Sequence, residues 1–100
     1  METNLEKVKT YLGFAVKSRH IKFGVDDILK LKKVNLILVS DALTETGYKK
    51  LNNFALKKSI DCLVLTAKEF NEIIQNTSIK ATAILDENLA DAIKKNLAKI

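Results

Sequence analysis

The sequence has no proline and no tryptophan, and only three glycines and one cysteine among its 100 residues. Without proline, helices and strands can run uninterrupted between turns. The single Cys62 cannot form an internal disulfide bond, which is typical of a reducing compartment, so we expect a cytoplasmic protein. The first residues lack the basic-then-apolar order of a signal peptide, and no apolar run approaches the roughly 20 residues of a membrane span. We therefore expect no membrane association.

Residues that carry out catalysis or bind metals are also scarce. His20 has no second histidine with which to share a metal ion, and its basic surroundings are typical of a solvated surface. Cys62 lies in an apolar run and is interpreted as an inert core residue. Gly24 lacks the companion glycines of a nucleotide-binding loop. The sequence therefore predicts no metal site and no cofactor.

Asp41 is the one candidate for a catalytic carboxylate. It follows an apolar run, as catalytic aspartates do in receiver domains and haloacid dehalogenase-like enzymes, but no neighbouring acidic pair accompanies it. We favour the interpretation that Asp41 starts a turn or caps the N–H groups of Thr44 and Glu45. The catalytic alternative predicts a concave pocket that holds Asp41 and another titratable group.

Positive charge dominates the chain and is unevenly distributed. The net charge is +5: residues 1–58 carry 12 basic and 6 acidic side chains (+6), whereas residues 59–100 carry 5 basic and 6 acidic side chains (−1). A one-sided basic surface is expected of a nucleic-acid binder. Such a surface is also common on proteins that bind no nucleic acid, so the charge alone does not assign the function.

Hydrophobic spacing predicts helices and strands in alternation. Helices are predicted at residues 3–17, 25–32, 46–58, 67–75 and 86–98, with caps at Thr3 or Asn4, at Thr66 and at Asp86. A short edge strand is predicted at residues 21–23, and a strand covered on both faces at 34–39. A second buried strand is predicted at 60–65 and a third substantial strand at 79–85. This alternation predicts a single α/β domain over residues 1–100. We expect a three-layer αβα sandwich, with a mixed central sheet of about four strands and helices on both faces.

The stretch from Lys17 to Asp41 is the candidate binding region. Gly24 directly precedes the second predicted helix, where a glycine allows close backbone approach and the first helical N–H groups favour a negative ligand. Six basic residues flank this turn in the sequence, namely Lys17, Arg19, Lys22, Lys30, Lys32 and Lys33. The alternative is an ordinary helix start surrounded by solvated lysines.

The same stretch carries a family resemblance. Residues 12–15, 17–27 and 36–42 resemble the small bacterial, ribosome-associated YlxQ-type branch of the L-seven-Ae / L-thirty-e superfamily, and the resemblance extends to residues 66–69 and 83–86. It implies an αβα sandwich, and many members bind kink-turn RNA. The superfamily's RNA-reading turn, Gly-x-Asn-Glu-x-x-Lys, matches Gly24 and Lys30, whereas Asp26 and Asp27 replace the Asn-Glu pair. A second RNA-facing loop matches residues 75–80.

The resemblance implies a small ribosome-associated protein that binds structured RNA, possibly of the kink-turn class, and we expect a monomer. Lys17, Arg19, Lys22, Lys30 and Lys33 would contact phosphates. Gly24 would allow the RNA backbone to approach closely. Asp27, beside Asp26, would accept hydrogen bonds from a base edge. Ile79, next to Lys80, would pack on an unstacked base. The alternative is a protein-interaction module of the same fold that has lost kink-turn recognition; it predicts an exposed apolar patch.

Overall fold

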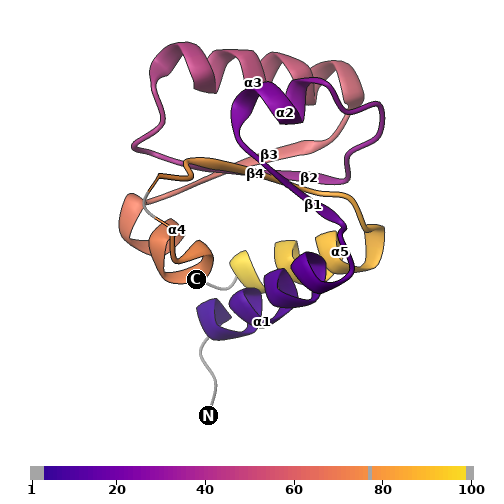
Figure 1. Cartoon of the computed structure of the whole chain (residues 1–100), viewed down its shortest axis with the longest axis vertical. Helices are drawn as coiled ribbons and strands as arrows, with labels where there is room; N and C mark the ends of the chain where they lie inside the picture. Colours follow the sequence, from indigo (N-terminus) through magenta and orange to yellow (C-terminus); the bar gives the residue numbers. More distant parts are fainter. Residues whose placement is uncertain (1–3, 77, 99–100) are drawn as a thin grey trace.

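The computed structural model describes residues 4–76 and 78–98. Helices and strands alternate along these residues in the order α1 (Asn4–Lys17), β1 (Ile21–Phe23), α2 (Val25–Leu29), β2 (Leu36–Ser40), α3 (Glu45–Lys58), β3 (Asp61–Leu65), α4 (Ala67–Ile74), β4 (Ala81–Ile84) and α5 (Glu87–Leu97). Figure 1 shows α2 and α3 on one face of the sheet and α1, α4 and α5 on the other. The predicted three-layer αβα sandwich is therefore confirmed. Within the described residues, no helix is long and apolar enough to cross a membrane.

The sheet is mixed, with the strand order β1-β4-β2-β3. β2 and β3 are parallel, whereas β4 is antiparallel to both of its neighbours. Consequently β1, β2 and β3 all end at the side of the sheet where β4 begins. We call this side the Gly24 end; it carries Gly24, residues 40–44, Thr66 and residues 78–80. The opposite side, the Arg19 end, carries residues 18–20, 31–35, 59–60 and 85–86.

Alternating side chains of β4 divide the core between the two faces of the sheet. Ala81 and Ala83 pack in the cluster beneath α2 and α3, whereas Ile84 packs in the cluster beneath α1, α4 and α5. All five residues of the central strand β2 are buried, as its unbroken apolar run predicts. Each face of the sheet therefore has its own hydrophobic cluster.

Side-chain caps fix the starts of the later helices. The Oγ1 atom of Thr66 accepts from the Glu69 N–H, and the Glu69 carboxylate accepts from the Thr66 N–H, each over 3.1 Å. Asp86 accepts from the Leu89 N–H over 2.9 Å. The predicted caps at Thr66 and Asp86 are confirmed. Of the two candidates for α1, Thr3 lies outside the described residues and Asn4 already belongs to the helix.

Two local predictions were wrong. The second helix ends at Leu29 rather than at residue 32, because the N–H groups of Lys30 and Leu31 bond three residues back, a tight closing turn that stops the helix. The strand predicted at residues 60–65 was expected to be buried, but β3 is the last strand of the sheet and its Val64 is 50% exposed. Its apolar residues indicated a strand without revealing its place in the strand order.

Candidate nucleic-acid interface

Gly24 joins β1 to α2 in a backbone conformation that favours glycine. Its φ is 89° and its ψ is 145°, a region that side chains with a Cβ atom rarely adopt. Its N–H donates to the Ala81 carbonyl oxygen over 3.0 Å, and its own carbonyl oxygen accepts from the Ile28 N–H over 3.1 Å. A Cβ atom built on Gly24 meets no heavy atom within 4 Å. The glycine is therefore required by the backbone, and the space beside it is open to a ligand.

The first turn of α2 differs from those of the later helices. Thr44, Thr66 and Asp86 each cap their helix with a side-chain oxygen, whereas Gly24 has no side chain with which to cap α2. However, α2 has only five residues, so at 1.5 Å per residue its ends lie only about 7.5 Å apart. The opposite partial charges at those ends largely cancel at a ligand. Lysine side chains must therefore supply most of any attraction for phosphate.

A buried hydroxyl group fixes β1 directly before Gly24. Thr82 is 0% exposed, and its Oγ1 atom donates to the Lys22 carbonyl oxygen over 2.9 Å. Lys22 pairs across the strands with Ala83, on the face that carries α2 and α3, and its side chain is exposed. The structure thus holds an exposed lysine close to the open space at Gly24.

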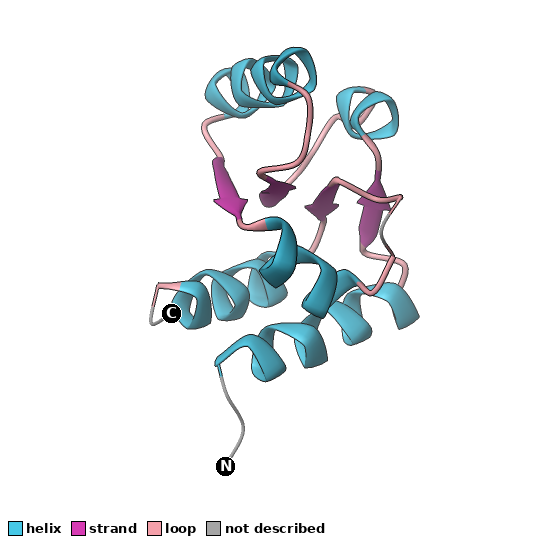
Figure 2. Cartoon of the chain, turned by 90° about the vertical axis from the view of Figure 1, so that its left-hand side faces the viewer, coloured by secondary structure: helices cyan, strands magenta, loops and turns pink. Residues whose placement is uncertain are grey.

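The loop before β4 lies at the same end of the sheet (Figure 2). The Ser40 N–H donates to the Lys80 carbonyl oxygen over 2.9 Å, which fixes the loop beside the end of β2. Ile79 is half-buried and packs against the cluster beneath α1, α4 and α5. Because Ala81 bonds to Gly24, Ile79 and Lys80 lie near the start of α2, although more than 50 residues separate them in the sequence.

Asp26 and Asp27 lie in the first turn of α2 with exposed side chains. Lys30 directly follows this short helix and is also exposed. The structure therefore gathers half of the predicted RNA-binding residues at the Gly24 end, namely Gly24, Asp26, Asp27, Ile79 and Lys80, with Lys22 and Lys30 adjoining them. The two carboxylates bring negative charge to this end and partly offset the lysines.

Three predicted basic residues do not reach this site. Lys17 and Arg19 precede β1, whose three residues span roughly 10 Å at about 3.3 Å each, and Lys33 precedes β2. They flank Gly24 in the sequence, but they lie at or near the Arg19 end of the structure. Arg19 adopts a left-handed conformation, with φ 61°, in the turn that closes α1 onto β1. Closeness in the sequence did not predict this separation. β1 lies between Arg19 and Gly24, and α2 with the loop after it lies between Gly24 and Lys33.

Basic residues from several segments gather at the Arg19 end, which lies at the right-hand side of Figure 1. The Lys58 ammonium group donates to the Lys32 carbonyl oxygen over 2.7 Å and lies 5.5 Å from the centre of the Phe54 ring. Salt bridges in the described residues join Lys49 to Glu45 and Lys94 to Asp61 and Asp91. The basic residues at this end, which have no such bridge there, are Lys17, Arg19, Lys32, Lys33, Lys57 and Lys58.

Lys57 and Lys58 were not among the predicted RNA-binding residues. The sequence did offer an indication of their position. Lys57 and Lys58 end a predicted helix just before a predicted strand, and Arg19 and Lys33 also precede predicted strands. Chain segments that precede strands of the same direction meet at one end of the sheet. This surface depends on the strand directions as well as on the positions of the lysines in the sequence.

Asp41 has a different structural partner from the one predicted. Its Oδ1 atom accepts from the Ala67 N–H over 3.0 Å, and its own N–H donates to the Leu65 carbonyl oxygen over 2.8 Å. Thr44 itself caps α3 by accepting from Gly47. Capping of Thr44 and Glu45 by Asp41 was therefore wrong, whereas Asp41 does lie in a turn, which the Leu43 N–H closes onto the Ser40 carbonyl oxygen over 3.0 Å. Because β2 and β3 are parallel and end side by side, Asp41 supports the start of α4 instead.

A hollow of about 300 Å³ beside Asp41 is also lined by Glu45 and Tyr48. It matches the concave pocket that the catalytic alternative predicts. Both carboxylates have structural partners, however, since Asp41 accepts from Ala67 and Glu45 pairs with Lys49 over 3.2 Å. The hollow therefore offers two exposed carboxylates that already serve the starts of α3 and α4.

Cys62 lies on β3 and is half-buried, and burial raises the pKa of its thiol. A raised pKa makes the thiol less reactive as a nucleophile near neutral pH. In the described part of the chain, no three His, Cys, Asp or Glu side chains are placed to hold a metal ion together. Within residues 4–76 and 78–98, the large apolar side chains that are exposed belong to three elements: Phe14 and Val16 to α1, Leu56 to α3, and Val64 to β3.

Comparison with known proteins places the fold. No protein-family model and no curated protein sequence matches the chain. A solved structure of a protein with unknown function from Bacillus halodurans C is 18% identical, with a TM-score of 0.80, and the match covers 92% of this chain and 97% of that one. The Giardia lamblia 15.5kD RNA binding protein is 14% identical, with a TM-score of 0.68, covering 100% of this chain and 90% of that one. At these identities, both likenesses show that the chain shares the fold of these proteins.

Proposed function

We propose that this chain is a small RNA-binding protein of the L-seven-Ae / L-thirty-e superfamily that binds structured RNA at the Gly24 end. The Gly24 turn would approach the RNA backbone. The loop at residues 75–80, which precedes β4 at the same end of the sheet, would contact the same RNA. We further propose that the RNA is ribosomal, that the RNA element belongs to the kink-turn class, and that the protein acts in the cytoplasm. Its role is binding, without catalysis.

The observation that carries this proposal is the convergence of two distant segments. The hydrogen bond from Gly24 to Ala81 brings the first turn of α2 against the loop that contains Ile79 and Lys80. These are the two segments that the sequence resemblance assigns to RNA. The fold shared with the Giardia lamblia 15.5kD RNA binding protein supports the same function.

The proposed contacts fall into two kinds. Lys22 and Lys30 would contact phosphates, which set the position of the RNA without reading its sequence. Asp27 would accept hydrogen bonds from base N–H groups, because an ionised carboxylate has acceptors and no donors. The basic Arg19 end would add long-range attraction, which raises the association rate and falls with salt.

The test is to crosslink the protein to RNA in living cells with ultraviolet light and to sequence the recovered RNA. A variant with Lys22→Gln and Lys30→Gln serves as the matched control, because both side chains are exposed and their loss leaves the core intact. We expect the parent to recover a small set of structured RNAs and the variant to recover much less of them. Equal recovery from both proteins would contradict the proposed site, and no RNA above background would contradict the proposed function.

A further inference from the structure

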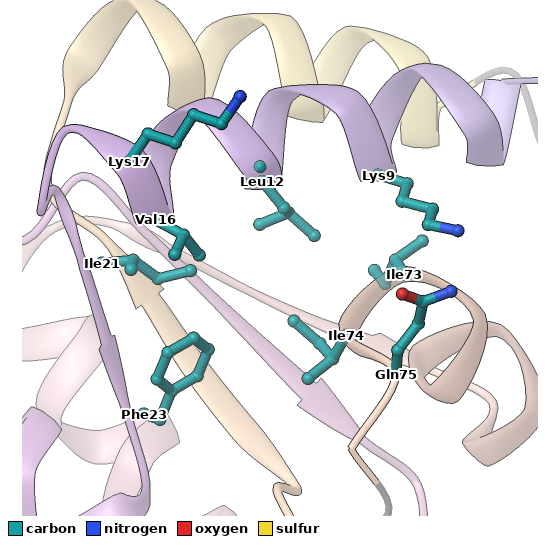
Figure 3. Close-up of a pocket in the computed structure, with 10 residues that line it drawn as sticks. Lys9, Leu12, Val16, Lys17, Ile21, Phe23, Ile73, Ile74 and Gln75 are labelled. Carbon is teal, nitrogen blue, oxygen red and sulfur yellow. The ribbon is translucent and has the colours of Figure 1, made fainter.

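An apolar groove of about 340 Å³ runs along the β1 edge of the sheet, between α1 and the end of α4. Figure 3 shows Leu12 and Val16 of α1 facing Ile73 and Ile74 of α4 across it, with Ile21 and Phe23 of β1 also lining the groove. Gly13 adds no side chain to the helix wall, and a Cβ atom built there meets nothing within 4 Å. α1 continues through Gly13 to Lys17, so the missing side chain leaves the groove open within an intact helix.

The groove adjoins the proposed RNA site. Phe23 directly precedes Gly24, and Gln75 begins the loop that leads to Ile79 and Lys80. Lys22 and Phe23 are consecutive residues of an edge strand, so their side chains point to opposite faces of the sheet. A strand of RNA at Gly24 can therefore pass around this edge from Lys22 to Phe23.

The chemistry of the lining fits one nucleotide. The walls are apolar and include the aromatic ring of Phe23, a surface on which an unstacked base can pack. The polar lining side chains are Lys9, Lys17 and Gln75, and the lining contains no carboxylate. Beyond Lys9, a neighbouring hollow is lined by Glu6 and Glu72, which would repel phosphate. The charges therefore favour a phosphate at the Lys17 side of the groove.

We infer that this groove binds an unstacked base of the same RNA, with the adjoining phosphate at Lys17; this inference rests on the proposed RNA-binding function. The RNA would be read at the Gly24 end and would continue as a single strand along the β1 edge. This site adds a preference for RNA in which a nucleotide is free of its helix. A fully paired stem cannot supply such a base.

The test fills the groove without removing any contact. Gly13→Leu places a side chain in the groove at a helical position with open space, where leucine is also the better helix former. Thr10→Leu is the matched control, because Thr10 is exposed on the same helix and does not line the groove. The probes are a hairpin RNA with a short bulge, the same hairpin with abasic bulge nucleotides, and the matched hairpin without a bulge.

We expect the parent and Thr10→Leu to bind the bulged hairpin roughly tenfold more tightly than the unbulged one, the scale expected for one stacked base. Gly13→Leu and the abasic bulge should each abolish this preference, and the two together should cause no further loss. Lys17→Gln is a second variant that does not depend on filling the groove. It should weaken binding to the bulged hairpin more than binding to the unbulged hairpin, which loses only long-range attraction.

Three outcomes would overturn the inference. If the parent prefers the bulged hairpin and Gly13→Leu retains that preference, the base lies elsewhere, while the RNA-binding function stands. If Gly13→Leu weakens binding to all three hairpins equally, the groove contacts the RNA backbone and holds no base. If the parent binds none of the hairpins, the inference fails together with the proposed function.

Discussion

The main-chain N–H of Gly24 lies 3.0 Å from the carbonyl oxygen of Ala81, and this hydrogen bond joins the turn after β1 to the first residue of β4. The bond continues the β1–β4 ladder by one residue, in which Phe23 pairs with Thr82. Gly24 can extend the ladder and start α2 at once only because its φ is 89°. One glycine therefore sets the position of both segments that we assign to RNA.

Replacing Gly24 with valine should damage both stability and binding. The left-handed conformation should cost a β-branched side chain about 1–3 kcal/mol of folding stability, although no atom obstructs its Cβ. The branched side chain would also occupy the open space that the RNA backbone must enter. We expect lower stability in urea unfolding together with the loss of RNA binding.

A stability control separates these two effects. Ile93 lies in the cluster beneath α1, α4 and α5, away from the Gly24 end. Ile93→Val should therefore lower the free energy of unfolding by about 0.5–1.5 kcal/mol. It should bind RNA as the parent does at a temperature where both are folded. Equal RNA binding by folded Gly24→Val and by the parent would remove Gly24 from the interface.

Salt dependence should distinguish the two ends of the sheet. Lys22→Gln with Lys30→Gln removes two charges near Gly24, whereas Lys57→Gln with Lys58→Gln removes two charges at the Arg19 end. Each lost phosphate contact should lower the slope of log affinity against log salt by roughly 0.7–0.9. We therefore expect a slope smaller by about 1.5 for the first pair and little change for the second.

Titration of one RNA over a range of salt concentrations measures both slopes. Both variants lose the same net charge, so a general field effect would change them equally. A larger loss for the Lys57 and Lys58 variant would move the phosphate contacts to the Arg19 end. Equal slopes in the parent and both variants would place the RNA away from either pair.

The fold was largely predictable because its signals are local. Helical periodicity and apolar runs indicated the order of the elements, and the Thr66–Glu69 capping box marked the start of α4, since both partners lie within one helical turn. The exposed face of Val64 was not predictable in this way. It depends on β3 being the last strand, which is set by packing between distant segments.

The candidate site was predictable only where its parts are consecutive in the chain. Gly24, Asp26 and Asp27 lie together because one turn holds them. Arg19 and Lys33 lie far from that turn, because a strand or loop separates each of them from it. Asp41 bonds to Ala67, 26 residues away, through the parallel pairing of β2 with β3. Strand directions, which the local pattern does not encode, decide these relationships.

Cys62 should react slowly and should make stability depend on alkaline pH. Burial raises the pKa of its thiol above the ordinary value of 9.0, so near neutral pH its thiolate fraction is lower than in the unfolded chain. Iodoacetamide should therefore alkylate the folded protein more slowly than the protein unfolded in urea. A faster reaction in the folded protein would contradict this, because it would require an activated thiol.

The sign of the pH dependence follows from the same shift. The folded-state pKa lies above the unfolded-state pKa, so the contribution of the thiol to stability is fully present below the unfolded value and is lost as the pH rises through the folded value. Relative to Cys62→Ala, the parent should therefore lose free energy of unfolding above pH 9.0 and show a constant difference at neutral pH. A difference that stays constant at alkaline pH would mean that the thiol titrates equally in both states.

The aspartate pair of α2 should limit the affinity for kink-turn RNA. Asp26→Asn would supply N–H donors that a carboxylate lacks and would remove one negative charge near phosphate, whereas Asp27→Glu would extend the acceptor by one methylene group. Both positions are exposed, so the double change should leave the fold intact. A well-formed pair of base contacts is worth roughly 1–3 kcal/mol in DNA readout. At about 1.4 kcal/mol per decade, we expect binding to tighten about tenfold or more.

The measurement is a titration of the parent and the double variant against a kink-turn RNA and a matched plain duplex at one salt concentration. Asp26→Asn alone is the control for charge, because it makes the same change in net charge without lengthening the second acceptor. A selective gain on the kink-turn would mean that the Gly24 end retains the other groups that read this RNA. A similar gain on both RNAs would mean that charge alone acts there. No gain on either would favour a protein-interaction role for this fold, because restoring the asparagine and glutamate would then not restore recognition.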